Sequence, residues 1–267
     1  MLPGVDRPPP EPVTRQPPRR VRRPVMTQRW ADLAYLHWPC DPDLLAPHLP
    51  PGTRLDTHDG RAWVGLVPFV MREVRVARVV PPPPLGWFCE TNVRTYSVGP
   101  DGRRGVVFLS LDAERALPVL VARTAFRLPY LWSWMRHERD GGVPTGRAGG
   151  PGAADPTGAT VTYRCSRRLP GPYGARSLVR LRVGERVEPT ALDDWLTARW
   201  GLHTARRGGT AYGPVEHPAW PLHAAELLDL DDGLVAAAGL PAPEGAPRVL
   251  WSPGVPVRIG WLEQVGR

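Results

Sequence analysis

Polar and apolar positions alternate most regularly along residues 88–96, whose sequence is Phe-Cys-Glu-Thr-Asn-Val-Arg-Thr-Tyr. Aromatic and β-branched residues favour an extended backbone, and Pro-Asp-Gly follows at 100–102, so the pattern predicts a β-strand. Side chains alternate between the two faces of a strand. One face therefore carries Phe88, Glu90, Asn92, Arg94 and Tyr96. The other face has small residues that suit a packed interior, so the polar face is either solvated surface or the wall of a site.

Extended segments dominate the rest of the chain. The patterns predict strands over 30–38, 54–57, 61–75, 105–111, 160–165, 175–183, 248–252 and 256–261. His-Asp-Gly at 58–60 and the residues at 100–103 mark two hairpin turns. Pro68 interrupts the long strand 61–75 and indicates a bulge or an edge position, because proline cannot donate a backbone hydrogen bond.

Helix signals are fewer. Asp41 followed by a proline predicts a short helix over 42–48. Apolar residues at helical spacing predict a longer helix over 189–200. The other predicted helices are 113–126 with Asp112 as its cap, a short one around Trp132, Trp134 and Met135, and 231–238. Residues 140–157 are rich in Gly, Pro and Ala, which predicts a surface loop within one domain.

Residues 1–25 have a composition of their own, with eight prolines and six arginines against two acids, a net charge of +4. Such a segment stays extended or disordered. We therefore expect a disordered arm over 1–27, a single β domain over 28–262 and a short tail over 263–267. Met26 directly precedes the first patterned strand. Either it is the true start of the protein, or the arm makes a weak contact with an anionic partner.

Composition argues against several classes of protein. The net charge is +8 over 267 residues, and half of it lies in the arm, which weighs against nucleic acid as a partner. The three cysteines and seven histidines show no metal-ligand or disulfide spacing, so we expect no metal and no cofactor. No apolar run could span a bilayer, and no signal peptide is evident, so we expect a cytoplasmic protein without a membrane partner. The sequence leaves a homo-oligomer open.

Nucleophile motifs are also missing from the sequence. All 34 basic residues are arginines, so no lysine side chain can form a Schiff base. The glycine pairs at 141–142 and 149–150 lack the strand, lysine and serine or threonine of a phosphate-binding loop, and no G-x-S-x-G esterase motif occurs.

Several motifs, in order and at consistent spacing, resemble one known family. They are Leu36-His37-Trp38, Leu55 to Gly60, Ala62 to Gly65, Glu90 to Tyr96, Phe108 to Ala113, Ala122-Arg123, Leu128-Pro129-Tyr130, Trp195 to Trp200 and His217 to Leu222. Together they resemble the YqjF-like family of uncharacterised bacterial proteins over about residues 28 to 262. That family in turn resembles the acetoacetate decarboxylase-like superfamily.

The resemblance implies a mostly β (α+β) fold: an antiparallel, cone-shaped β-barrel with a few peripheral helices and an internal pocket. In the decarboxylase a lysine forms a Schiff base, with an acid and an arginine nearby. Glu90 matches the acid. The segment from Arg123 to Tyr130 matches the one that leads to the lysines, with Tyr130 in place of the first lysine and Leu131 in place of the second. The resemblance therefore implies a pocket without the decarboxylase nucleophile.

The candidate residues on the strand each have a structural alternative. Glu90 would act as acid, base or hydrogen-bond acceptor, or it forms an ion pair with Arg94 that fixes strand register. Asn92 and Arg94 would orient a carboxylate or carbonyl ligand, because a guanidinium offers a bidentate fork, or they bond loop backbone instead. Tyr96 is either a ligand contact or part of the core.

The other candidates come from elsewhere in the chain. His37, Tyr130 and His217 are possible acid–base partners of Glu90. Arg123 and His217 are also possible ligand contacts. The two histidines have the alternative of being buried structural residues. Three functions stay open: a pocket for a small carboxylate- or carbonyl-containing metabolite, a lyase or isomerase that uses Glu90, and a structural or nucleic-acid-binding protein acting through the arm.

Overall fold

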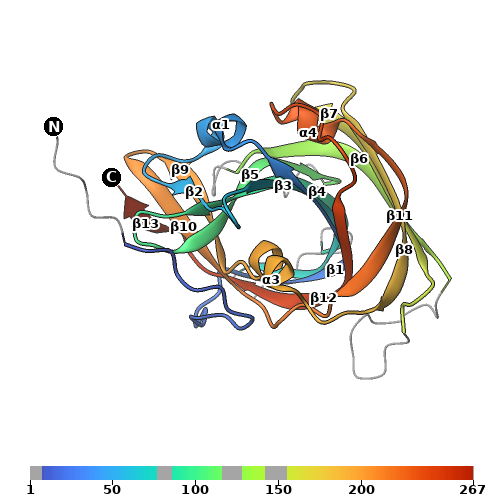
Figure 1. Ribbon diagram of the computed structural model, residues 1–267, viewed down its shortest axis with the longest axis horizontal. Helices are drawn as coiled ribbons and strands as arrows, with labels where there is room; N and C mark the ends of the chain where they lie inside the picture. Colours follow the sequence, from blue (N-terminus) through green and yellow to red (C-terminus); the bar gives the residue numbers. More distant parts are fainter. Residues whose placement is uncertain (1–7, 77–85, 116–127, 142–154, 267) are drawn as a thin grey trace.

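The computed structural model describes residues 8–76, 86–115, 128–141 and 155–266. Strands dominate and the helices are short, so the predicted mostly β fold is confirmed (Figure 1). The strands are β1 (Met26–Cys40), β2 (Arg54–Leu55), β3 (Ala62–Val76), β4 (Phe88–Val98), β5 (Arg104–Ala113), β6 (Tyr130–Asp140), β7 (Thr160–Leu169), β8 (Arg176–Arg186), β9 (Gly201–Arg206), β10 (Gly209–Glu216), β11 (His223–Asp232), β12 (Arg248–Ile259) and β13 (Glu263–Gly266). The helices are α1 (Pro42–Leu45), the 3-10 helix η1 (Ala46–His48), α3 (Ala191–Thr197) and α4 (Leu234–Ala237).

Strand pairing closes two rings that share one wall. The larger ring has nine strands and runs β5-β6-β7-β8-β11-β12-β1-β3-β4 and back to β5. The smaller ring runs β5-β9-β10-β12-β1-β3-β4 and back to β5. β5 pairs in parallel with β6 and with β9, and the other pairs that form the rings are antiparallel. Because side chains alternate along a strand, each strand of the shared wall presents one face to each ring.

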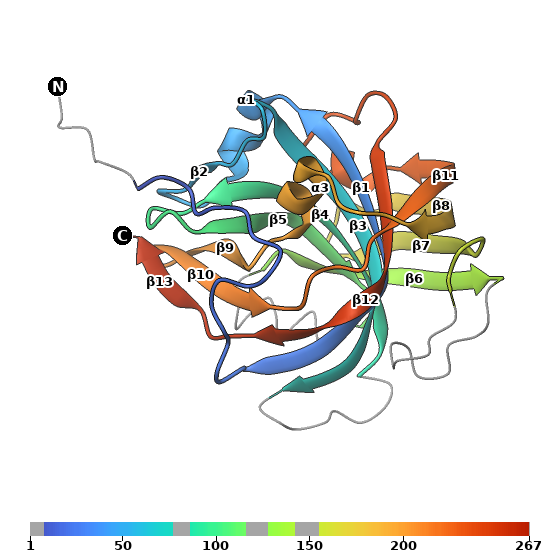
Figure 2. The same ribbon diagram turned by 60° about the horizontal axis from the view of Figure 1, so that its bottom comes forward.

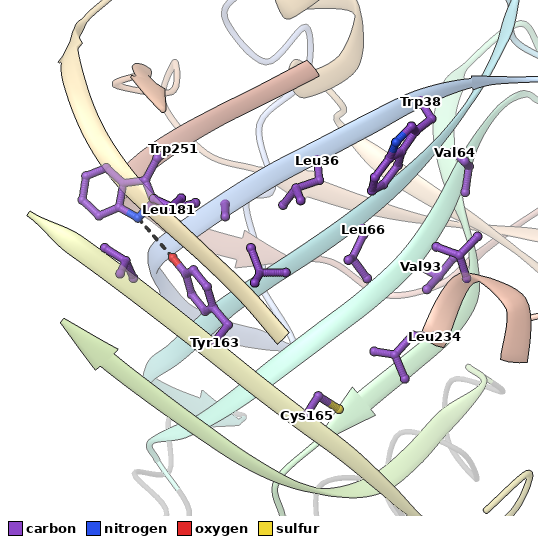
Figure 3. Packing of buried hydrophobic residues seen from close by; sticks show 14 of the residues in the cluster. Leu36, Trp38, Val64, Leu66, Val93, Tyr163, Cys165, Leu181, Leu234 and Trp251 are labelled. Carbon is purple, nitrogen blue, oxygen red and sulfur yellow. Dashed lines mark hydrogen bonds between the residues drawn. The ribbon is translucent and has the colours of Figure 1, made fainter. Parts of the chain in front are cut away.

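The larger ring is filled with apolar side chains (Figure 3). Leu36 and Leu66 of the shared wall lie in one cluster with Tyr163 and Leu181 of the β7–β8 hairpin, and all four are nearly fully buried. The Trp251 indole N–H donates to the Tyr163 hydroxyl at 3.1 Å. Burial of this much apolar surface supplies the main driving force for folding. The larger ring is therefore the main hydrophobic core of the domain.

Helix α3 closes one end of the smaller ring (Figures 1 and 2). It begins with a capping box, in which the Asp193 N–H donates to the Thr190 hydroxyl at 3.2 Å and the Asp193 carboxylate accepts from the Thr190 N–H at 2.9 Å. Trp195 and Leu196 then pack with Tyr96 of β4. The helix predicted over 189–200 is present but shorter, because the cap is Thr190 and the residues after Thr197 lead into β9.

Pro68 lies in the centre of the sheet, between β1 and β4. The pairing with β4 runs straight through it, whereas the pairing with β1 is irregular between Ala31 opposite Val70 and Leu36 opposite Leu66. The proline therefore sits where no hydrogen bond from its nitrogen is needed. The predicted bulge is confirmed, and the alternative of an edge strand is wrong.

The helix predicted around Trp132, Trp134 and Met135 is wrong, because this segment is the strand β6. Its burial alternates with period two: Met135 is buried between partly exposed neighbours, and Trp134 is 47% exposed. The tryptophans follow the β preference of aromatic residues rather than a helical core stripe. Asp112 is not a helix cap, since β5 runs to Ala113 and the Asp112 carboxylate pairs with Arg167. Most of the predicted helix 113–126 lies outside the described residues.

Other boundaries also shift. The hairpin of β7 and β8 and the short helix capped by Asp41 are confirmed. The predicted helix 231–238 shrinks to α4, because the two aspartates before it belong to β11. The two predicted closing strands are one continuous strand, β12. Residues 263–266, expected to be a tail, form β13 and pair with β10.

The N-terminal segment, for which the composition predicts a disordered arm, has no regular secondary structure over residues 8–25 but lies against the barrel. The Arg104 Nε–H donates to the Glu11 carbonyl at 2.6 Å, Arg258 donates to the Val21 carbonyl at 2.7 Å, and Arg15 pairs with Asp194 at 2.8 Å. Val21 itself is buried. Arginines of the barrel thus satisfy backbone carbonyls that an extended segment leaves unpaired. Within the described ranges, no helix is long and apolar enough to cross a membrane.

Candidate functional site

The polar face of β4 points into the smaller ring. Cys89 and Val93 belong to the core of the larger ring, and Phe88 and Tyr96 belong to the clusters of the smaller one. Across the β3–β4 pairing, Glu90 lies opposite Phe69 and Arg94 lies opposite Gly65. We call Glu90, Asn92, Arg94 and Tyr96, together with Tyr35, His37 and Tyr130, the inner-face site. The alternative of a solvated face is excluded by burial, because Glu90 is only 3% exposed and Asn92 only 4%.

Glu90 and Tyr130 form the first pair of this site. The Tyr130 hydroxyl donates to the Glu90 carboxylate at 3.0 Å. Parallel pairing of β5 with β6 puts Tyr130 opposite Leu111 and so brings its side chain to this position. Burial raises the pKa of Glu90 to about 8, although the hydrogen bond from Tyr130 opposes the shift. Burial, and then the Glu90 charge, raise the pKa of Tyr130 well above its usual value. Glu90 is therefore mostly protonated near neutral pH and can exchange a proton there.

His37 and Tyr96 form the second pair. Their Nε2 and hydroxyl oxygen lie 2.6 Å apart, and the hydroxyl also lies 3.1 Å from the Leu196 carbonyl oxygen. Burial, followed by the charges of Arg94 and other arginines, lowers the pKa of His37 well below its usual value, so the imidazole is neutral. Gly65 makes room for this ring, because a Cβ there would lie 2.7 Å from Nε2.

The Arg94 guanidinium lies among aromatic rings and has no carboxylate partner among the described residues. Its guanidinium carbon is 5.4 Å from the Tyr35 ring centroid and 5.7 Å from that of Tyr96. Nη2 donates to the Leu196 carbonyl at 3.4 Å, whereas Nε is buried without a partner. Among the described residues no acid forms an ion pair with Arg94, so the expected alternative of a Glu90–Arg94 pair is wrong. Outside the described ranges the sequence contains a single Asp or Glu, which is Asp6.

Other unpaired polar atoms lie around Arg94. The Asn92 Oδ1 atom and the indole nitrogens of Trp63 and Trp195 are buried without hydrogen-bond partners. Trp195 packs against Tyr96 with ring centroids 4.9 Å apart. Buried polar groups in native proteins are nearly always paired. The unpaired donors, which are two indole N–H groups and the Arg94 Nε–H, thus outnumber the one unpaired acceptor, Asn92 Oδ1, and they could donate hydrogen bonds to the oxygens of a ligand.

His217 lies in a separate aromatic cluster. Its ring stacks near Trp200 and Trp220, at 4.6 and 4.9 Å between centroids, and its Nδ1 lies 2.8 Å from the Pro218 carbonyl oxygen. Burial lowers the pKa of His217 to about 4. The structure thus places His217 with neighbouring aromatic rings rather than with Glu90. Arg123 lies outside the described residues.

Trp220 connects that cluster to the inner-face site. Its ring contacts Tyr35 edge-on at 5.5 Å, and Tyr35 in turn contacts Arg94. A surface pocket opens beside Trp220 and shares Val187 and Leu222 with the apolar cluster around Tyr35. The pocket therefore lies one side chain away from the inner-face site. Sequence reasoning missed Tyr35, although its position two residues before His37 on the same strand face could have indicated it.

The described residues hold no group of three or more His, Cys, Asp or Glu side chains placed to bind a metal. What the site does hold is one carboxyl–phenol pair, one imidazole–phenol pair and one guanidinium without a counter-ion. Such groups can bind an anion, orient a carbonyl and move a proton.

Known structures with this arrangement of strands define the class. The fold is that of acetoacetate decarboxylase-like proteins. An acetoacetate decarboxylase-like enzyme from Sphingomonas wittichii RW1 superposes with a TM-score of 0.60 at 17% identity, covering 93% of this chain and 96% of that one. The enduracididine biosynthesis enzyme MppR, complexed with the condensation product of pyruvate and imidazole 4-carboxaldehyde, superposes with a TM-score of 0.59 at 14% identity. The match covers 91% of this chain and 90% of that one. Acetoacetate decarboxylase from Legionella pneumophila superposes with a TM-score of 0.54 at 12% identity, and the match covers 97% of this chain and 93% of that one.

Sequence comparison then gives the family. Residues 27–256 match the model of a family described as "Uncharacterized conserved protein". The chain is 33% identical over 224 residues to the uncharacterized protein YqjF of Bacillus subtilis (strain 168). The alignment covers 84% of this chain and 85% of that protein. The chain belongs to this YqjF-like family, and the predicted resemblance is confirmed.

Proposed function

We propose that the inner-face site binds a small metabolite that carries a carboxylate or a carbonyl group. The observation that carries the proposal is Arg94, a largely enclosed guanidinium that has aromatic neighbours but no carboxylate partner among the described residues. A buried charge is costly unless it is paired, and a carboxylate ligand would pair it through a bidentate contact. The unpaired N–H groups around it would donate hydrogen bonds to the remaining ligand oxygens.

The chemistry differs from that of a Schiff-base decarboxylase. Because the chain contains no lysine, a ligand carbonyl cannot become a lysine imine. Tyr130 supplies a hydroxyl near the acid Glu90 instead. MppR has been solved in complex with pyruvate, and that protein shares the fold. This supports a 2-oxo acid as the first ligand class to test.

The test measures pyruvate and acetoacetate binding by calorimetry and thermal shift, with sodium chloride at equal ionic strength as the control. The Arg94→Gln variant should bind at least about ten-fold more weakly, since a hydrogen bond to a charged group contributes about 1.5–3 kcal/mol. Arg180→Gln is the matched control, because Arg180 is exposed on β8. Equal binding by the two variants would contradict the proposal. So would an unmodified protein that binds neither pyruvate nor acetoacetate.

A second function is favoured by the Glu90–Tyr130 pair. Glu90 in its ionised form would take a proton from the carbon next to the ligand carbonyl, Tyr130 would donate a hydrogen bond to the enolate oxygen, and Glu90 would return the proton. This is the chemistry of an isomerase or a lyase. The reaction needs the carboxylate, so its rate should rise with pH up to about 8.

Deuterium exchange tests this second function. Pyruvate in heavy water should lose its methyl proton signals faster with the protein than without it, by proton NMR. Glu90→Gln should abolish the acceleration, and Arg94→Gln should slow it only at low pyruvate. An exchange rate that Glu90→Gln leaves unchanged would rule out this function while leaving ligand binding in place.

A further inference from the structure

A second polar cluster lies on the opposite face of β1 and β3, at one end of the larger ring. Trp30 and Met71 pack toward the smaller ring, so their neighbours Arg29 and Arg72 point to the other face. The cluster consists of Arg29, Arg72, Asp32, Arg139 and His137, and we call it the bulge cluster. It shares no side chain with the inner-face site.

The backbone is strained at the bulge cluster. Three described non-glycine residues have positive φ, and Asp59 is the ordinary case, in a hairpin turn. The other two lie within strands: Asp32 with φ 45° in β1 and Glu73 with φ 53° in β3. Each coincides with an irregularity in the β1–β3 pairing. Such conformations persist only where surrounding contacts hold them, and they gather at binding sites.

The two bulges bring positive charges together. The Asp32 carboxylate, whose side chain is 8% exposed, accepts from Arg72 at 2.9 Å and from Arg139 at 3.2 Å. Arg29 lies directly opposite Arg72 in the β1–β3 pairing. Like charges in that position repel each other. Three guanidinium groups therefore gather near a single carboxylate.

Nearby acids have partners of their own. Glu138 pairs with Arg136 at 2.6 Å, and Glu114 lies 3.7 Å from Arg115 and accepts from the Cys89 N–H at 3.2 Å. Glu73 is exposed. The described surroundings thus leave the bulge cluster with an excess of positive charge.

Three nitrogen atoms of the cluster lack a hydrogen-bond partner. Arg29 Nε, Arg72 Nε and His137 Nε2 are all buried without a hydrogen-bond partner. Native proteins have few such atoms, and each one left unpaired is costly. Arg29 and Arg72 come from the neighbouring strands β1 and β3, whereas His137 comes from β6, which pairs with neither of them. A tetrahedral oxyanion has oxygens in several directions, whereas the two oxygens of a carboxylate lie in one plane.

We propose that the bulge cluster is a binding site for a phosphate group, whether inorganic phosphate or the phosphate of a small ester. The anion would neutralise the excess charge of Arg29, Arg72 and Arg139. It would also accept hydrogen bonds from the unpaired guanidinium nitrogens and from the His137 imidazole. The bulges at Asp32 and Glu73 hold the cluster in place before the anion binds.

Inorganic phosphate is the probe for the test. Thermal shift and calorimetry compare phosphate with sodium chloride at equal ionic strength, and sulfate and acetate distinguish a tetrahedral anion from a carboxylate. Saturable binding of phosphate that Arg72→Gln weakens by about ten-fold or more would support the site. Arg180→Gln on the exposed face of β8 should bind phosphate like the unmodified protein.

Several outcomes would overturn the proposal. They are no saturable phosphate binding beyond the chloride control, binding of acetate as strong as that of phosphate, and binding lost in Arg94→Gln but kept in Arg72→Gln. The last result would assign the anion to the inner-face site. If Arg72→Gln does not fold, the same comparison uses His137→Ala, because His137 is half-buried and forms no ion pair with a described acid.

Discussion

Replacing Glu90 by glutamine should make the protein more stable at high pH. Burial raises the pKa of Glu90 from 4.5 to about 8, so the folded state holds the proton more strongly than the unfolded chain does. Below the unfolded pKa both states are protonated and ionisation has no effect. As pH rises toward the folded pKa, the unfolded chain ionises first, so the free energy of unfolding falls, and it levels off above that pKa. Glutamine does not ionise and escapes this loss.

The size of the effect follows from the shift. One pKa unit corresponds to about 1.36 kcal/mol. Raising the pKa from 4.5 to about 8 therefore removes about 5 kcal/mol in total and about 3 kcal/mol by pH 7. Glutamine keeps an oxygen that accepts from the Tyr130 hydroxyl, so the main change is the lost charge. The difference in unfolding free energy between Glu90→Gln and the unmodified protein should widen by about 4 kcal/mol from pH 5 to pH 9.

Urea denaturation at pH 5, 7 and 9, followed by circular dichroism, measures this difference, and other titrating groups cancel because they occur in both proteins. Tyr130→Phe is an informative companion variant. It removes the hydrogen bond that lowers the pKa of Glu90, so the loss of stability should become larger and continue to higher pH. A difference between Glu90→Gln and the unmodified protein that stays constant within about 1 kcal/mol from pH 5 to pH 9 would refute the reasoning. It would mean that water solvates Glu90 in the folded state.

Three further predictions concern stability, each measured as the change in unfolding free energy in urea. Gly65→Ala should destabilise by about 1–3 kcal/mol because its Cβ would clash with His37, whereas Gly86→Ala, with open space around it, should change little. Arg167→Met should cost about 3–5 kcal/mol, because it leaves the fully buried Asp112 carboxylate without a counter-ion, although the Ser133 hydroxyl still donates to it, and a cost under about 1 kcal/mol would show that water reaches that carboxylate. Thr190→Ala should cost about 1 kcal/mol through loss of the α3 cap, and equal stability of variant and parent would contradict the role assigned to the capping box.

Local patterns predicted much of the fold. Alternation along 88–96 correctly put Glu90, Asn92, Arg94 and Tyr96 on one face, because the period of a strand is a local property. Turn residues located the turn at 58–61 and the hairpin of β4 and β5, although β2 pairs with β4 and not with β3 as predicted. Pro68 correctly indicated the irregularity beside it. The Asp112 helix cap and the helix predicted around Trp132 are wrong, at β5 and β6, for the same reason. Capping signals and aromatic clusters are short-range, whereas the parallel pairing of these two strands joins distant segments.

The candidate site was predictable only in part. The sequence indicated Glu90 and Tyr130 as neighbours through the family resemblance, and the structure places them 3.0 Å apart. The sequence could not predict that Glu90 and Arg94 form no ion pair. The conformations of these two long side chains depend on the residues packed around them, such as Tyr35 beside Arg94. Nor could the sequence predict the bulge cluster, which needs residues of β1, β3 and β6 to meet in space.

The sequence by itself determined which side chains share a strand face, that no lysine is available for covalent chemistry, and to which family the chain belongs. Only the tertiary structure determined which residues surround each face of a strand. Closing two rings through one shared wall buries both faces of β4, so that the same strand borders the apolar core on one side and a donor-rich interior on the other. Burial then fixes the protonation state of Glu90 and His37, because desolvation depends on everything packed around a group and not on its neighbours in the chain.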